Sequence, residues 1–334
     1  MPCSYTDPKK VFMTVNSISF PNLHITFPFV PKTISVFGFE IAIYGIIMAS
    51  GMILAGIFVL FEAKRLKLKQ DDYLDLIIWG LIGGIVGARL YYVAFSWDDY
   101  KDNLLQIFNF RAGGLAIYGA VIGGVLAGFI VCKVRKMSFF GSADMAAFGL
   151  LIGQVLGRWG NFCNREAFGT YTNGLFAMLI PYDMVNRTQD ITDEMMRNMV
   201  TVDGINCISV HPTFLYESLW NLGVLIFLLI YRYRKKFNGE LFFLYLGLYG
   251  AGRAWIEGLR TDPLLIGNTN IRVSQVLALV LVFGSAIFLA FNYTRLIRKK
   301  QEPLPRTTTL RKMKQMEAEK IVKDSQKNSS DTTS

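Results

Sequence analysis

The sequence predicts an all-α integral membrane protein with seven transmembrane helices and a small extracytoplasmic head between the fourth and fifth helices. Three features predict this class: an apolar composition, a series of weakly charged runs of about 20 residues, and basic residues that gather in alternate loops. Apolar residues make up 52% of the 334 residues, a share that excludes an ordinary soluble protein. Each run is long enough to cross a hydrocarbon core of about 30 Å.

Residues 1–39 precede the first apolar run and predict an N-terminal arm at the membrane interface. Pro21, Pro28 and Pro31 lie among aromatic residues there, which disfavours an additional membrane span. Residues 40–157 then contain four apolar runs. The predicted helices are 41–61, 74–95, 113–132 and 139–157.

The second and third predicted helices are rich in glycine, including Gly83 and Gly87 in one and Gly119 and Gly123 in the other. Small residues let two helix backbones approach closely inside a membrane. We therefore expect these glycines to pack the two helices together. A phosphate-binding loop is a weaker explanation, because such a loop needs a preceding strand.

Residues 158–211 form a connection that is too long for a tight turn, and they predict the extracytoplasmic head. Apolar and polar residues alternate there around Gly174 and Pro181, as in a small folded unit. Cys163 and Cys207 both fall in this region, where they could pair or remain free thiols.

The last part of the membrane region covers residues 212–295 and contains three more apolar runs. The predicted helices are 212–231, 240–258 and 273–293. Residues 296–334 are basic at first and then rich in Ser, Thr and Lys, which predicts a disordered cytoplasmic tail.

The distribution of basic residues predicts the direction of each helix. Lysines and arginines gather in the first, third and fifth connections and after the last helix, whereas the second connection is acidic. The positive-inside rule then places the N-terminus outside and the C-terminus in the cytoplasm. The same distribution explains the net charge of +10, so nucleic acid is not an expected partner.

This topology places the unusual polar residues of several helices at one depth, near the outer face. Arg158 ends the fourth helix there, and the sixth helix carries Tyr249, Arg253 and Glu257 at spacings of four residues, on a single face. An Arg253–Glu257 pair that only neutralises two membrane charges is one explanation. With Arg158 at the same depth, an anionic ligand is the better one.

Two other functions could account for these charges. An outward-facing transporter or channel for small anions could line a conduit with the same arginines. Transporters place polar residues across both halves of the membrane and often contain internal repeats, neither of which this sequence has. A purely structural scaffold leaves the clustering of charges in the outer half unexplained.

Residues 157–169 read GRWGNFCNREAFG. This segment resembles the G-R-x-G-N-F-x-N-x-E-x-x-G signature of the bacterial prolipoprotein diacylglyceryl transferases, with every specified position present. Four further segments resemble motifs of that family, in the same order, and the resemblance extends over about residues 35–295. These segments are 87–93, 113–119, 211–217 and 249–260.

Two positions depart from the family pattern. Tyr118 stands where some members have a histidine that has been proposed as a general base, and a tyrosine with a pKa near 10 is a poor base at neutral pH. Phe214 replaces a glutamine in the 211–217 motif, which removes an amide from that position.

The resemblance implies an activity at the bacterial cytoplasmic (inner) membrane. Members of the family transfer the diacylglyceryl group of phosphatidylglycerol to the lipobox cysteine of a prolipoprotein, and glycerol phosphate leaves. The acceptor cysteine then belongs to the substrate, and the chemistry needs no metal or organic cofactor. The implied partners are phosphatidylglycerol, prolipoprotein signal peptides and membrane lipids.

The resemblance also implies roles for particular residues. As catalytic residues we expect Arg158 and Arg253 to stabilise the phosphate, Glu257 to orient the arginines or receive a proton, and Tyr118 to position substrate or transfer protons. The expected substrate-binding residues are Tyr44, Arg89, Gly113, Gly114, Asn161, Glu166, Gly169 and Tyr249.

Overall fold

The structure is a computed structural model that describes residues 13–109, 113–262, 265, 269 and 271–298. These residues form two compact units, which are described separately. The first contains the chain up to Ala55, Phe148–Leu229 and Phe243–Phe291. The second contains Gly56–Ala147, Ile230–Phe242 and the chain from Asn292 onward.

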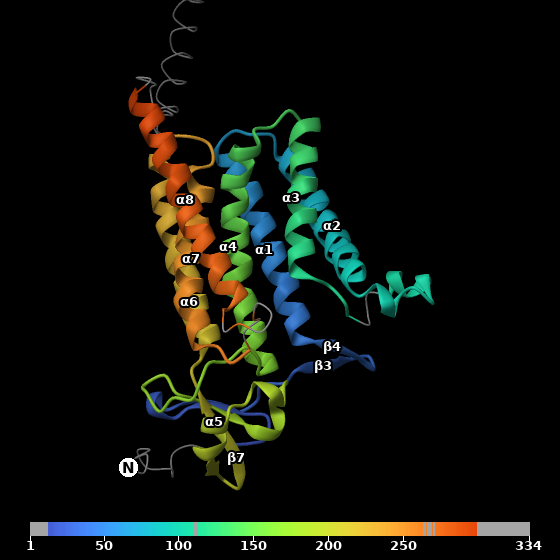
Figure 1. The fold of residues 1–334 in the computed structure, drawn as a ribbon, viewed down its shortest axis with the longest axis vertical. Coiled ribbons are helices and arrows are strands. Elements are labelled where there is room, and N and C mark those ends of the chain that lie inside the picture. The colour runs from blue at the N-terminus through green and yellow to red at the C-terminus, as the bar shows by residue number, and fades with distance from the viewer. Residues whose placement is uncertain (1–12, 110–112, 263–264, 266–268, 270, 299–334) are drawn as a thin grey trace, which may run out of the picture. The chain divides into compact units, whose positions relative to one another are not determined.

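Seven long helices dominate the described chain (Figure 1). They are α1 (Ile43–Arg65), α2 (Gln70–Phe95), α3 (Ile117–Val134), α4 (Phe139–Asn164), α6 (Thr213–Tyr231), α7 (Glu240–Leu259) and α8 (Val273–Arg298). Six of the helices in the described residues are long and apolar enough to cross a membrane. Helix α7 is not among the six, and Arg253 and Glu257 lower its apolar character.

The structure corrects several predicted helix boundaries, and two of them lie beside predicted site residues. The fourth helix was expected to end at 157, but α4 continues to Asn164 and therefore includes the first half of the 157–169 segment. Arg165 then adopts a left-handed backbone with a φ of +53°, which ends the helix. The third helix begins at Ile117 rather than at 113, because Gly113 and Gly114 have φ angles of +84° and +78°.

A five-stranded antiparallel sheet corrects the all-α expectation. Its order is β2-β1-β5-β7-β6. The strands are β1 (Ile18–Phe20), β2 (Ile25–Phe27), β5 (Met178–Pro181), β6 (Val200–Val202) and β7 (Ile205–Val210). Ser19 of β1 pairs with Leu179 of β5, so the N-terminal segment and the predicted head share one sheet.

The sheet is stabilised by a compact apolar core. Ile18, Ile180 and Ile208 are buried together, and Met195 of the short helix α5 (Asp193–Arg197) joins them. Cys163 and Cys207 are both free thiols, and burial raises the pKa of the Cys207 thiol to about 11.

Strands β3 (Thr33–Val36) and β4 (Phe39–Ala42) form a separate hairpin that leads directly into α1. All residues of both strands are exposed, and Phe37 at the turn is 98% exposed. Phe37 and Gly38 both have positive φ angles, as a tight two-residue hairpin turn requires.

The glycines of α2 and α3 pack the two helices closely, which confirms that expectation. A Cβ atom added to Gly87 would lie 2.4 Å from the carbonyl oxygen of Gly119, and one added to Gly123 would lie 2.2 Å from that of Gly83. Any larger side chain at these positions would force the helices apart.

Candidate active site

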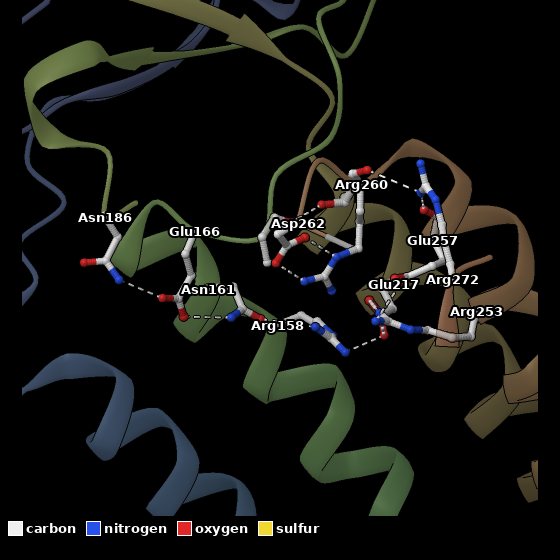
Figure 2. Close-up of polar contacts among 12 residues, drawn as sticks. Arg158, Asn161, Glu166, Asn186, Glu217, Arg253, Glu257, Arg260, Asp262 and Arg272 are labelled. Carbon is white, nitrogen blue, oxygen red and sulfur yellow. Dashed lines mark hydrogen bonds and ion pairs between the residues drawn. The ribbon is translucent and has the colours of Figure 1, made fainter. Parts of the chain in front are cut away.

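A carboxylate on α6 holds two arginines from two other helices (Figure 2). Glu217 Oε1 lies 2.5 Å from Nη2 of Arg158, on α4. Nη1 of Arg253, on α7, donates to both oxygens of Glu217 at 3.1 and 3.3 Å. The three helices therefore bring two guanidinium groups together over one negative charge.

Arg253 also pairs with Glu257, one helical turn further along α7. Nη2 of Arg253 lies 2.7 Å from Oε2 of Glu257 and forms an ion pair with it. The spacing of four residues places the two side chains on one face, as the sequence predicted. We refer to Arg158, Glu217, Arg253 and Glu257 as the arginine cluster.

The arginine cluster contains two cations and two carboxylates, so its formal charges balance. From the sequence, two arginines were expected to compete for one carboxylate, Glu257. Glu217 was not among the predicted site residues, although it closes the 211–217 motif. The signal that could have found it is an acidic residue in the first turns of an apolar helix.

The carboxylates of the arginine cluster are more deeply buried than its guanidinium groups. The side chains of Glu217 and Glu257 are 3% and 2% exposed, whereas those of Arg158 and Arg253 are 21% and 16% exposed. The carboxylates are thus covered while part of each guanidinium remains accessible. Two partly open guanidinium groups can bind a phosphate through several N–H donors at once.

A chain of amide contacts extends from Arg158 toward the sheet. Nη1 of Arg158 donates to Oδ1 of Asn161 at 3.3 Å, and Nδ2 of Asn161 donates to Oε1 of Glu166 at 3.0 Å (Figure 2). Asn164 and Asn186 also donate to Glu166, at 3.3 and 2.9 Å. Glu166 therefore orients amides and reaches Arg158 only through Asn161.

A polar pocket of about 180 Å³ lies at the end of this chain of contacts. Its lining residues are Asn161, Glu166, Ala167, Arg187, Asp190, Arg260 and Asp262. Arg260 donates to both carboxylate oxygens of Asp262, at 2.8 and 2.6 Å. Burial, reinforced by the charge of Asp262, raises the pKa of Asp190. Three of these residues, Arg187, Asp190 and Asp262, were not predicted as site residues, and no motif indicates them.

Tyr44, Gly169 and Tyr249 belong to the same compact unit as the arginine cluster. The ring of Tyr44 packs on Gly160, where an added Cβ would lie 2.5 Å from it. The N–H of Gly169 donates to the carbonyl of His211 at 2.9 Å, and an added Cβ there would lie 2.8 Å from His211 Cβ. Gly169 therefore lets the chain after α4 pass close to the start of α6.

Arg89, Gly113 and Gly114 lie together in the other unit. Arg89 is buried and donates to five main-chain carbonyls at 2.7 to 3.1 Å, those of Gln106, Ile107, Asn109, Gly113 and Gly114. An added Cβ on Gly114 would lie 2.5 Å from Nη1 of Arg89. This geometry gives Arg89 a structural role in the loop before α3, and its contact with substrate remains a prediction.

Tyr118 lies in the first turn of α3, in the same unit as Arg89. Its side chain is partly exposed, and its ring centroid lies 6.5 Å from that of Tyr91. The ring is therefore accessible from outside the protein, but its catalytic role remains a prediction.

Together, the six apolar helices of the described residues define a membrane protein, and the arginine cluster gives it two partly open guanidinium groups. The family model of prolipoprotein diacylglyceryl transferase matches residues 31–291, and the chain belongs to this family of multi-pass membrane transferases.

Individual relatives agree with the family match. The chain is 44% identical over 253 residues to the phosphatidylglycerol–prolipoprotein diacylglyceryl transferase of Clostridioides difficile (strain 630), which covers 76% of this chain and 91% of the relative. It is 40% identical to the protein of that name from Finegoldia magna, over 80% of this chain and 97% of the relative. It is 43% identical to the Listeria welshimeri protein of that name, over 76% of this chain and 87% of the relative. The family expected from the 157–169 segment is thereby confirmed.

Proposed function

We propose that this protein transfers the diacylglyceryl group of phosphatidylglycerol to the cysteine thiol of a prolipoprotein lipobox. A thioether forms and glycerol phosphate leaves, which is the first step of lipoprotein maturation. The observation that carries this proposal is the pair of partly open guanidinium groups of Arg158 and Arg253, held over buried Glu217. Membership of the family indicates the class of reaction, and the arginine cluster provides guanidinium groups able to bind the phosphate of phosphatidylglycerol.

The reaction determines where the positive charge is needed. The cysteine sulfur bonds to the glyceryl carbon that carries the phosphate, the carbon–oxygen bond breaks, and its electron pair stays on the phosphate oxygen. The phosphate therefore gains negative charge in the transition state. Arg158 and Arg253 stabilise that charge, because donors held in place by Glu217 and Glu257 need not reorganise during the reaction.

Other residues hold the substrate beside these arginines. Asn161 binds the headgroup with its orientation fixed by Glu166, and Tyr44 and Tyr249 complete the wall of the site. Free cysteine has a pKa near 8.5, so the acceptor thiol needs a base or a positive environment. The arginine cluster provides the positive environment.

The proposed location is the bacterial inner membrane, with α7 as a seventh span, the N-terminus outside and the C-terminus in the cytoplasm. The five-stranded sheet then forms an extracytoplasmic head that includes β1 and β2 of the predicted arm 1–39, and the β3–β4 hairpin forms the part at the membrane interface. An interfacial hairpin accounts for the exposed Phe37 and Phe39, because lipid covers apolar side chains that the protein leaves open.

Cysteine labelling tests this orientation. Reporters at Asp99 and within 175–205 should react with an impermeant reagent added outside, and reporters at Lys67 and Lys136 should react only after the membrane is opened. The reason is the segregation of basic residues among the loops. Labelling of a Lys136 reporter from outside would refute the orientation.

A reconstituted assay tests the proposed activity. Purified protein is incubated with phosphatidylglycerol labelled in the acyl chains and with a peptide that contains a lipobox cysteine. We expect a thioether-linked product by mass spectrometry, and none from a matched peptide with serine in place of that cysteine. Absence of product together with anion flux through protein-containing vesicles would favour the transporter instead.

Tyr118 provides a test of the proton-transfer step. If its hydroxyl only positions the headgroup, Tyr118→Phe should lower the rate by about 10-fold, the loss of one hydrogen bond to substrate, and leave the pH dependence unchanged. Rate is measured against pH, with protein levels verified. Complete inactivity of the folded variant, or a change in the alkaline limb of the profile, would instead make Tyr118 an acid–base residue.

A further inference from the structure

Arg165 is the largest of the fully buried side chains in the described chain, with 1% of its surface exposed. It occupies an unspecified position of the 157–169 signature, between Asn164 and Glu166. Its Nη2 donates to the carbonyls of Asn16 at 2.9 Å and Val30 at 2.7 Å, and its Nη1 donates to the carbonyl of Cys163 at 3.2 Å. The side chain therefore ties the end of α4 to the N-terminal segment 16–30.

Burying Arg165 in this way lowers the stability of the folded protein. The three acceptors are neutral carbonyls, and Nε of Arg165 is buried without a hydrogen-bond partner among the described residues. Burial lowers the pKa of the guanidinium, as expected for a cation removed from water. Because burying this cation costs free energy, we expect Arg165 to have a role beyond filling space.

The backbone beside Arg165 is also strained. Arg165 and Ala167 have φ angles of +53° and +54°, so Glu166 stands between two left-handed residues that carry side chains. We call residues 165–167 the Glu166 turn. On its other side the turn is held by Thr213, whose hydroxyl donates to the carbonyl of Ala167. Contacts from both sides thus hold a conformation that the chain would otherwise avoid.

We infer that Arg165 is a positioning residue of the active site: it fastens the Glu166 turn to segment 16–30 and, through Glu166, orients Asn161 beside Arg158. This inference rests on the proposed function. It makes Asn16 and Val30, the two residues whose carbonyls Arg165 binds, part of the arrangement that orders the site, although neither touches the arginine cluster in the contacts of the described residues.

Three substitutions separate the parts of this role. Arg165→Met keeps most of the volume and removes every donor, and transfer should fall about 10- to 100-fold, the loss typical of a misplaced site. Arg165→Gly relieves the strain of the left-handed backbone but also removes the donors, so it should be no more active than Arg165→Met. Arg165→Lys keeps the charge with fewer donors and should lie between Arg165→Met and the wild type.

The decisive comparison is with Glu166→Gln. If Arg165 acts through Glu166, the double variant Arg165→Met/Glu166→Gln should be no less active than Glu166→Gln alone. A merely structural arginine would multiply the two losses. The matched control is Asn22→Ala, which removes another tie of the N-terminal segment, to the carbonyls of Asn173 and Gly174 at 3.2 and 2.8 Å, without touching the Glu166 turn. Asn22→Ala should keep full transfer activity.

A measurement without substrate keeps this inference separate from the proposed function. Hydrogen exchange in detergent should be faster at the amides of Val30 and Glu166 in Arg165→Met, and Asn22→Ala should leave Glu166 unchanged. No transfer by the wild type would refute the proposed function only. Unchanged exchange at Glu166, multiplied losses in the double variant, or unfolding of all three Arg165 variants would refute the role of Arg165.

Discussion

Replacing Arg253 with lysine should lower diacylglyceryl transfer by about 100- to 1,000-fold, the range for loss of a donor aimed at developing negative charge. Lysine keeps the positive charge, but it lacks the planar fork that contacts Glu217 and Glu257 and still presents N–H groups to a phosphate. The variant is assayed in detergent with labelled phosphatidylglycerol and a lipobox peptide, and its level and thermal unfolding are compared with those of the wild type.

Arg232→Lys is the matched control for this substitution. Arg232 is 13% exposed and pairs with the buried carboxylate of Glu62 at 2.5 Å, which closely resembles the setting of Arg253. It belongs to the other compact unit and has no proposed part in the reaction. Activity near that of the wild type in Arg253→Lys, or an equal loss in both variants, would reduce Arg253 to a structural ion pair.

The helices could be predicted from the sequence because their signal is local. Hydropathy located all seven long helices, and most ends fall within a few residues of the prediction. Larger differences, of four to seven residues, occur at Arg65, Gln70, Ile117, Asn164 and Arg298. Those at Ile117 and Asn164 depend on backbone angles of Gly113, Gly114 and Arg165 that hydropathy does not report.

The sheet could not be predicted because its signal is not local. Strand β1 pairs with β5 some 160 residues further along the chain, and β1, β2 and β6 have only three residues each. Strands this short give too few alternations to recognise. Their pairing depends on tertiary contacts such as those of Arg165, which no pattern around residues 16–30 indicates.

The site residues show a similar division. Arg158 and Arg253 were predicted as site residues because charged groups in an apolar segment usually have a function, and Asn161 and Glu166 because they match the 157–169 signature. Arg89 was also predicted as a site residue, but its guanidinium donates hydrogen bonds to five main-chain carbonyls of the protein itself. A sequence does not reveal whether a buried arginine is satisfied by its own backbone or by a ligand.

Glu217 should prove as important as the arginines, although no role was predicted for it. Glu217→Gln keeps the shape of the side chain and removes the one charge that Arg158 and Arg253 share. Both guanidinium groups then lose their common anchor, so transfer should fall about 100-fold or more. Removing one partner of a buried ion pair also destabilises a protein by about 3–5 kcal/mol, so thermal unfolding should occur at a lower temperature. Glu257→Gln, which removes an ion pair with Arg253 and none with Arg158, should have a smaller effect.

The chain offers a close control for Glu217→Gln in Glu62. Its buried carboxylate also holds two arginines, Arg65 and Arg232, but in the other compact unit. Glu62→Gln should therefore lower the unfolding temperature by a similar amount while each folded molecule keeps its transfer activity. Activity is measured per folded molecule for both variants below their unfolding temperatures. An equal loss of activity in Glu62→Gln would mean that general destabilisation explains the effect of Glu217→Gln, and that the anchoring role of Glu217 is wrong.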